Sequence, residues 1–501
     1  MDPGFATDAG SAPRAPGAAL PLDRRAAAIL LRTALWAGGF WAYHEWLVLD
    51  TKGPLRLSFG ALRSYHALPL YANWARSLSG WLVPALVVIA GFLFACRALY
   101  LAPRPPRALP LLAISWFFFI AIGFSVSMID AYTLPDGSLF LPFTVAYSQK
   151  GLDYFGDVPL VDHWGGPAVF LERFAVRSYY ERLSLHAGSH PPGGILLLWA
   201  ASRLIGRDMA LTALASVAFT GVTLLPVWGL ARRLYGADVA RLALALFLVT
   251  PNFVMFTTTS MDGPFSVPLI LSVWVFFEIV AMSGGRPWAR ACGLGLLMAV
   301  ASLMTYASCL LGLLFGTVTL LLARDRPRFA RIAWSLAVAL ALFALCHLAL
   351  HVFTGYDAVT ALRRAMAHDR GLMGARFQGF EHFVKLGFLN LAAFLLGVGI
   401  PQAALWAGEV VRLLRAAGPR GPAEAFLLGS AATLALTAFS TLFTGEVERV
   451  WLFMVPLVVV PVARRLAEHG GPDGASVPAY WVLGLLGLQL VTFEVLLNTR
   501  W

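Results

Sequence analysis

The chain has 501 residues, of which 59% are hydrophobic and only 13% charged, and its mean hydropathy is +0.72. Soluble domains average about 45–50% apolar and about 25% charged residues, so a soluble chain of this length would lack the charge needed to coat its surfaces. The net charge of +11 is spread between apolar segments, whereas a nucleic-acid-binding protein concentrates it on one face. The composition excludes a soluble enzyme, a nucleic-acid-binding protein and a disordered scaffold, and it predicts an all-α polytopic membrane protein.

Apolar runs long enough to cross a hydrocarbon core, which takes about 20 residues, recur along the chain and predict about 13 transmembrane helices. They lie near residues 27–47, 79–100, 108–129, 208–230, 239–257, 263–283, 290–306, 307–323, 331–353, 386–408, 423–443, 449–463 and 478–497. No clear break separates 290–306 from 307–323. The apolar segment 192–206 is short, and we expect it to insert only partly. Before the N-terminal spans of 23–129, residues 1–22 are expected to form a disordered cytoplasmic tail.

The arginines between these runs predict the orientation of the chain. If 192–206 does not cross, the main Arg clusters fall on one side, which the positive-inside rule assigns to the cytoplasm. The opposite side then receives 48–78, a long loop at 130–191, a second loop at 354–385 and the turn 444–449. Residues 192–501 supply the remaining spans. Nearly all polar clusters that are not arginines lie on this outer side, so we expect the chemistry there.

The loop 130–191 is much longer than a helix connection, which usually takes about 2–8 residues. It is therefore expected to be a folded, partly helical element. Asp130 opens it as a span ends, and is either a helix-end carboxylate facing water or a general base whose partial desolvation raises its proton affinity. Asp153 and Asp157 are either solvated acids or a second carboxylate that orients an acceptor or holds a divalent cation.

The loop closes with His190-Pro191-Pro192-Gly193. Two prolines fix the backbone in a rigid, extended form, and the glycine allows close approach of another group. A helix start needs one proline at most. The string is therefore not explained by a helix start alone. It favours a histidine that the rigid backbone holds at a fixed height and angle at the membrane edge.

Later candidates are more isolated. Asp262 is either the N-cap of the next helix or an acid that faces the same cavity as Asp130, and Tyr306 is either an interfacial anchor or a substrate contact. Arg449 lies on the outer side, where it either pairs with Glu446 or holds a phosphate. The loop 354–385 carries basic residues that could attract lipid phosphates: Arg363, Arg364, His368, Arg370, Arg376, His382 and Lys385.

These features together resemble the GT-C membrane glycosyltransferases. The string at His190 is similar to the His-Pro-Pro-Leu-Gly stretch of protein O-mannosyltransferases, and Asp262 resembles the second acidic position of aminoarabinose transferases. The segment 445–453 looks like the late Glu/Arg/Trp segment of bacterial members. The resemblance covers roughly 110–465. It departs from the family pattern because no adjacent Asp-Glu pair follows the first loop's opening span and because two extra spans precede that loop.

The resemblance implies transfer of a sugar from a polyprenyl-phosphate donor, with inversion, on the outer (periplasmic or extracellular) face of the inner membrane. In this scheme Asp130 takes the proton of an acceptor hydroxyl, while Arg449 and His190 offset charge on the departing phosphate. The expected catalytic residues are Asp130, Asp157 and Asp262. The expected substrate-binding residues are His190, Glu446, Arg449, Asp153 and Tyr306. The acceptor is a lipid, a glycan or a protein, and a requirement for a divalent cation (Mg or Mn) is left open.

Two other functions compete with this one. A secondary transporter would show inverted repeats and ionisable residues near the bilayer midplane, yet no repeat is evident and the embedded acids Glu278 and Glu494 lack an obvious partner. A lipid-linked polysaccharide polymerase or ligase would favour a large outer loop late in the chain, whereas the largest one here is early.

Overall fold

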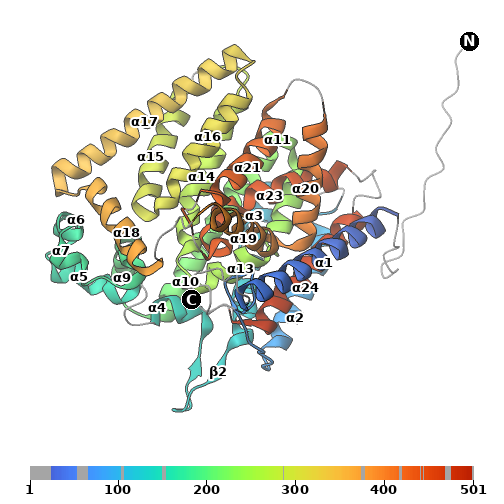
Figure 1. Ribbon diagram of the computed structural model, residues 1–501, viewed down its shortest axis with the longest axis horizontal. Helices are drawn as coiled ribbons and strands as arrows, with labels where there is room; N and C mark the ends of the chain where they lie inside the picture. Colours follow the sequence, from blue (N-terminus) through green and yellow to red (C-terminus); the bar gives the residue numbers. More distant parts are fainter. Residues whose placement is uncertain are drawn as a thin grey trace, which may run out of the picture.

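The computed structural model describes residues 24–52, 66–102, 106–148, 154–285, 287–373, 379–416, 420–440, 442–443, 445–468 and 476–498. The predicted tail 1–22 and the candidate Asp153 lie outside these residues. The described chain is a bundle of helices (Figure 1). The four strands within these ranges are two residues long and form two antiparallel pairs, β1 (Asn73–Trp74) with β4 (Leu497–Asn498) and β2 (Tyr132–Thr133) with β3 (Leu139–Phe140).

Seven helical segments in the described ranges are long and apolar enough to cross a membrane. They are α2 (Leu82–Leu99), α3 (Ala108–Ser127) with η2 (Met128–Asp130), α10 (Met209–Thr220) with η5 (Gly221–Thr223) and α11 (Leu224–Tyr235), α14 (Asp262–Val280), α17 (Arg326–Thr354), α19 (Phe380–Val398) and α24 (Ser476–Leu496). The pair α12 (Ala237–Phe247) and α13 (Pro251–Thr259), bent by 56°, makes an eighth if it is one span. The prediction of a helical multi-pass membrane protein is confirmed, whereas the count of about 13 is not.

The remaining long helices are shorter or less apolar. They are α1 (Arg24–Lys52), α9 (Gly193–Ile205), α15 (Trp288–Met304), α16 (Cys309–Leu321), α18 (Ala358–Met373), α20 (Ile400–Arg415), α21 (Pro422–Ala438) and α23 (Val455–Glu468). The segment 192–206 appears as α9, whose 13 residues rise about 20 Å at 1.5 Å per residue. That length is too short for a full crossing of about 30 Å.

Two breaks between helices divide apolar runs of the sequence. Thr305 leaves the helical region with φ −155° and its hydroxyl accepts a hydrogen bond from the amide of Ala307, so α15 ends and a new turn, η6 (Tyr306–Ser308), begins. The span expected at 386–408 is divided at Gly399, whose φ of 115° is a conformation that only glycine adopts readily. The chain therefore makes two helices, α19 and α20, where one was predicted.

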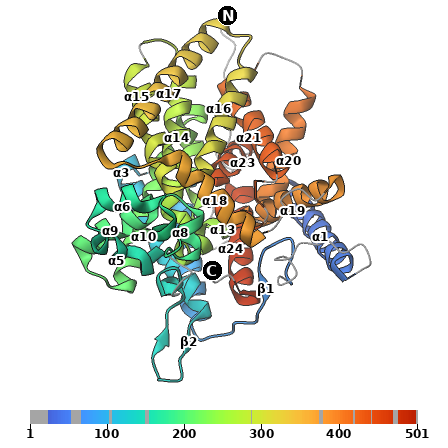
Figure 2. The same cartoon turned by 60° about the vertical axis from the view of Figure 1, so that its left-hand side comes forward.

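The loop 130–191 folds as a hairpin followed by short helices. These are η3 (Pro142–Thr144), α4 (Val145–Ser148), η4 (Tyr154–Asp157), α5 (Val158–His163), α6 (Pro167–Phe174), α7 (Arg177–Tyr180) and α8 (Leu185–Ser189). They share a small apolar core, in which the rings of Trp164 and Phe170 stack at 5.2 Å. Figure 2 shows these helices and the β2 hairpin toward one end of the bundle, which we call the loop end.

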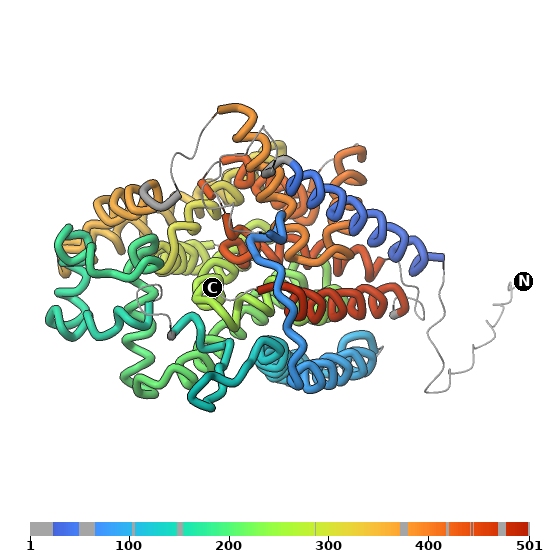
Figure 3. Tube along the Cα trace, turned by 60° about the horizontal axis from the view of Figure 1, so that its bottom comes forward, coloured from blue at the N-terminus to red at the C-terminus, as the bar shows by residue number. Residues whose placement is uncertain are grey.

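The N-terminal segment reaches the same end from across the molecule. After α1, residues 66–80 run over the end of α24 (Figure 3), where β1 pairs with β4. Tyr71 in this segment is fully buried. Its hydroxyl donates to Oδ1 of Asn390 in α19 at 3.0 Å, so the segment is held by polar contacts as well as by packing.

The expectation that Glu278 has no partner is wrong. Trp274 donates to its carboxylate at 3.2 Å, and the Nε atoms of Arg233 and Arg290 lie 3.7 and 4.0 Å from it. The arginines come from α11 and α15, which pack on α14. Sequence distance concealed this pairing because the three helices meet only in the folded bundle.

Gly193 is the point where α9 contacts the end of α15. A Cβ atom at this position would lie 2.2 Å from the carbonyl oxygen of Leu303 and 2.7 Å from its carbonyl carbon. Since real Cβ atoms do not approach a backbone so closely, only glycine allows this contact. The predicted role of this glycine, close approach by another group, is the one that it has in the folded chain.

Gly193→Ala is therefore expected to lower the stability of the protein by about 1–3 kcal/mol, the usual cost of overpacking. Thermal unfolding of the purified protein in detergent measures the change. Gly293→Ala is the control, because a Cβ added to Gly293, within α15, would meet no atom within 4 Å, and alanine is the better helix former. Equal midpoints for the two variants would contradict the proposed close contact.

Candidate functional site

His190 lies between α8 and α9 in extended backbone, with φ −126° and ψ 164°. Its Nδ1 lies 3.1 Å from the carbonyl oxygen of His186, and because a carbonyl only accepts, Nδ1 must carry the proton. The rings of Phe265 and Tyr154 lie 5.5 and 5.8 Å from the imidazole, centroid to centroid. The string of two prolines thus presents a histidine whose ring is fixed by a backbone hydrogen bond and two aromatic neighbours.

Burial lowers the pKa of His190 to about 4, although the nearby Asp262 carboxylate acts in the opposite direction. The imidazole is therefore neutral near pH 7. With its proton on Nδ1, it offers a lone pair at Nε2. It is suited to accept a hydrogen bond from a hydroxyl and poorly suited to act as a cation beside a phosphate.

Asp262 and Arg449 form the centre of the cluster. Asp262 begins α14, and its Oδ2 accepts a hydrogen bond from the hydroxyl of Ser260 at 3.0 Å. Arg449 comes from α22 (Val447–Val450), and its Nε lies 3.1 Å from the same carboxylate oxygen. The Nη2 of Arg449 also pairs with Glu446 at 2.5 Å. The predicted pairing of Arg449 with Glu446 is confirmed, and Asp262 joins it.

This guanidinium already has two carboxylate partners. The Arg449 side chain is only 9% exposed, while those of Asp262 and Glu446 are 12% and 21% exposed. The protein's own acids therefore engage Nε and Nη2 of the guanidinium. The arrangement makes Arg449 a positioning residue for Asp262, held in place in turn by Glu446.

The other predicted residues lie on other elements. Asp130 is 4% exposed on η2, next to Ile129, whose carbonyl accepts a hydrogen bond from Ser79 at 2.7 Å. Asp157 is 6% exposed, and its Oδ2 accepts the amide of Ser184 at 2.8 Å. Burial raises the pKa of Asp157, and its hydrogen bonds from Ser184 counteract that rise.

Asp157 thus fastens η4 to the start of α8, a structural contact within the loop. Tyr306 lies on η6 at the break after α15, near the rings of Tyr180 and Tyr356. The structure brings together His190, Asp262, Glu446 and Arg449, but sets Asp157 and Tyr306 in different surroundings.

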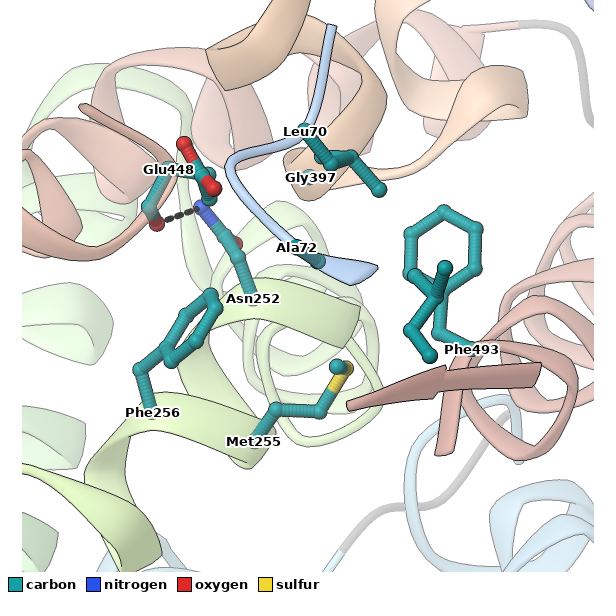
Figure 4. Close-up of a pocket in the computed structure, with 9 residues that line it drawn as sticks. Leu70, Ala72, Asn252, Met255, Phe256, Gly397, Glu448 and Phe493 are labelled. Carbon is teal, nitrogen blue, oxygen red and sulfur yellow. Dashed lines mark hydrogen bonds between the residues drawn. The ribbon is translucent and has the colours of Figure 1, made fainter. Parts of the chain in front are cut away.

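Glu448 is a polar residue of this region that the sequence did not single out. It is 2% exposed, and its Oε1 accepts the amide of Tyr71 at 2.8 Å. Its backbone carbonyl accepts a hydrogen bond from Asn252 at 2.9 Å (Figure 4). Glu448 and Asn252 line a pocket with room for about one water molecule. The local sequence does not show that Glu448 differs from its neighbour Glu446, because both acids lie in the same turn.

Within the described ranges, no three His, Cys, Asp or Glu side chains come close enough together to hold a metal ion. The requirement for a divalent cation stays a prediction.

The comparisons with known proteins agree with the predicted resemblance. Residues 189–350 match the family model of dolichyl-phosphate-mannose-protein mannosyltransferases. The resemblance to this superfamily of membrane glycosyltransferases is confirmed. The match is limited to about a third of the chain; it includes His190, Asp262 and Tyr306, and excludes Asp130 and Arg449. No curated protein matches the sequence.

Two solved structures of ArnT from Cupriavidus metallidurans are similar to this chain. The one bound to undecaprenyl phosphate is 14% identical, with a TM-score of 0.47 over 74% of this chain and 62% of that one. The apo structure is 16% identical, with a TM-score of 0.43 over 72% of this chain and 61% of that one. The chain thus spans somewhat over 60% of the length of these proteins.

Replacing Arg449 with alanine is expected to cost about 3–5 kcal/mol of stability, the usual range for breaking a buried ion pair, because two carboxylates lose their cation. The thermal midpoint in detergent measures it. Arg177→Ala is the matched control, since the Arg177–Glu181 pair is 80% and 62% exposed and such pairs contribute at most about 1 kcal/mol. A small, equal shift in both variants would show that Arg449 is not structurally coupled to Asp262.

The buried carboxyl group of Glu448 is expected to make the stability of the protein depend on pH. Burial raises its pKa from 4.5 to about 8 in the folded protein, so the unfolded chain releases this proton first and stability falls as pH rises from about 4.5 through 8. Glu448→Gln cannot ionise. Its thermal midpoint should match the parent's below pH 4.5 and exceed it increasingly up to pH 8, by an energy on the order of a few kcal/mol. Glu181→Gln, at an exposed site, should show no such divergence; a constant offset for Glu448→Gln at all pH values would refute the buried proton.

Proposed function

We propose that the chain is a glycosyltransferase that moves a sugar from a polyprenyl-phosphate donor to an acceptor hydroxyl, with inversion, on the outer face of the inner membrane. The observation that carries this proposal is the convergence of His190, Asp262 and Arg449, which arrive from three segments far apart in the sequence. The family match over 189–350 supports it, since two of these three residues lie in that range.

Asp130 is proposed as the general base. Its carboxylate is 4% exposed at the end of α3, where the loop 130–191 begins. There it would take the proton of the acceptor hydroxyl as the oxygen attacks the anomeric carbon. The bond to the lipid phosphate breaks on the opposite side of the sugar, so the configuration inverts.

Asp262 would have a different part in the same reaction. The transition state of sugar transfer resembles an oxocarbenium ion, which a nearby carboxylate stabilises. Because Arg449 and Ser260 both contact Oδ2 of Asp262, the carboxylate is held in one orientation and does not need to reorganise during the reaction. His190 beside it would accept a hydrogen bond from a hydroxyl of the substrate through Nε2.

The experiment that tests this proposal measures sugar transfer from a polyprenyl-phosphate sugar in membranes containing the protein. Asp130→Asn should reduce transfer by at least about 100-fold, the usual contribution of a general base, with normal expression. Asp262→Asn should also reduce it, because the amide carries no charge to stabilise the transition state.

Asp136→Asn serves as the control. It removes an acid from the hairpin just after Asp130, but Asp136 is exposed and contacts only Ser138 among the described residues. Its transfer rate should equal the parent's. Full activity of Asp130→Asn would eliminate that residue as the base, and full activity of both Asn variants at 130 and 262 would overturn the proposed function.

A further inference from the structure

The helix α18 (Ala358–Met373) has two different faces. Val359, Leu362 and Met366 are 58%, 39% and 41% exposed, whereas Ala361 and Ala365 are almost fully buried. α18 packs on α8 through its buried face (Figure 2). Its exposed side carries these apolar side chains together with Arg363 and Arg370, and such a mixture is typical of a helix that lies at a lipid interface.

Two cationic or titratable side chains lie toward the buried side of α18. Arg364 and His368 are one helical turn apart and half-buried. The Nε of Arg364 and the Nε2 of His368 are fully buried, and neither finds a hydrogen-bond partner among the described residues. Arg364 also forms no ion pair there, in contrast to Arg449, whose charge is shared by two carboxylates. A buried N–H group without a partner is costly, and an anionic ligand would accept hydrogen bonds from the Nε–H of Arg364 and from His368 in the tautomer that is protonated at Nε2.

The groups opposite α18 are hydroxyl-bearing rings. The ring of Tyr180 meets that of His368 edge-on, with centroids 6.3 Å apart, and its hydroxyl donates to the carbonyl of Gly188. Arg364 is close enough to Tyr180 to counteract the rise in its pKa that burial causes. Tyr306 lies near Tyr180, and its buried hydroxyl has no hydrogen-bond partner in the described chain.

We propose that Arg364, His368 and Tyr306 form the phosphate subsite of the lipid-linked donor. A guanidinium offers two parallel N–H donors that match the oxygens of a phosphate, and the tyrosine hydroxyl and imidazole add two more donors. This inference rests on the proposed function, because it assigns the donor's phosphate to the site. It moves the phosphate contact from Arg449, which is already paired, to an arginine that is not.

The position of this subsite fits the rest of the cluster. Gly188 contacts the subsite from α8, since a Cβ there would lie 3.2 Å from Nε2 of His368. Only Ser189 separates Gly188 from His190, which lies beside Asp262. A phosphate on one side of this turn would place the attached sugar toward the acids on the other. The exposed apolar faces of α18 and of the end of α17, where Val352 and Phe353 are 67% and 82% exposed, would contact the polyprenyl chain.

The test measures equilibrium binding of a radiolabelled polyprenyl phosphate to the full-length protein in detergent. Arg364→Gln should weaken binding by roughly 10- to 100-fold, the value of charge-assisted hydrogen bonds. Arg364→Lys should retain part of the affinity, and Tyr306→Phe should show a smaller loss. Arg363→Gln is the matched control: it removes the same charge one residue away on the same helix, at an exposed position, and should bind within about twofold of the parent. Thermal midpoints equal to the parent's confirm that the variants fold.

Equal losses in Arg364→Gln and Arg363→Gln, or no loss in either, would overturn the subsite. Competition by the polyprenol of the same length and by inorganic phosphate shows whether the site binds a lipid phosphate or free phosphate. If inorganic phosphate binds through Arg364 as tightly as the lipid does, the ligand is free phosphate and the lipid assignment fails. Binding does not require transfer. An Arg364-dependent lipid phosphate site in a protein that transfers no sugar would therefore refute the proposed function and leave the subsite intact.

Discussion

The ion pair between Arg449 and Asp262 is the contact on which the cluster at the loop end depends. It joins the start of α14 to α22, and His190 of the α8–α9 turn lies against it. A buried arginine is stable only when its charge is compensated. The start of α14 must therefore pack against α22 for Arg449 to be buried. Glu446 completes the compensation from a backbone position with φ 56°, a conformation that non-glycine residues rarely adopt.

Arg449 and Arg364, which both face this region, differ in whether the protein itself neutralises their charge. Arg449 is enclosed by carboxylates and orients one of them, which is a structural use of charge. Arg364 is half-buried on α18 and finds no ion-pair partner among the described residues, which leaves its charge available to a ligand. The proposed reaction uses a paired and an unpaired arginine. The paired arginine holds the carboxylate of Asp262 in place, and the unpaired one binds and releases the phosphate of the donor. The same residue cannot do both at once.

The sequence predicted the members of the central cluster better than their roles. His190, Asp262, Glu446 and Arg449 were candidates because each is unusual in its local setting, and all four meet in space. The charge of His190 stays a prediction, but burial lowers its pKa, which favours the neutral ring. The catalytic role of Asp157 stays a prediction, and in the fold its carboxylate accepts the amide of Ser184 at the start of α8. Glu448 was overlooked because burial, which distinguishes it from Glu446, is a property of the fold and leaves no mark on the local sequence.

The amino-acid sequence alone determined that this is a helical multi-pass membrane protein, because the shortage of charge and the recurring apolar runs are summed over the whole chain and do not depend on how helices pack. It also located the rigid turn at His190, since prolines and glycines fix the backbone locally. Only the tertiary structure decided which charges are paired, as at Glu278 and Arg449. These depend on side chains brought together from distant helices, and the energy of a buried charge is set by those neighbours.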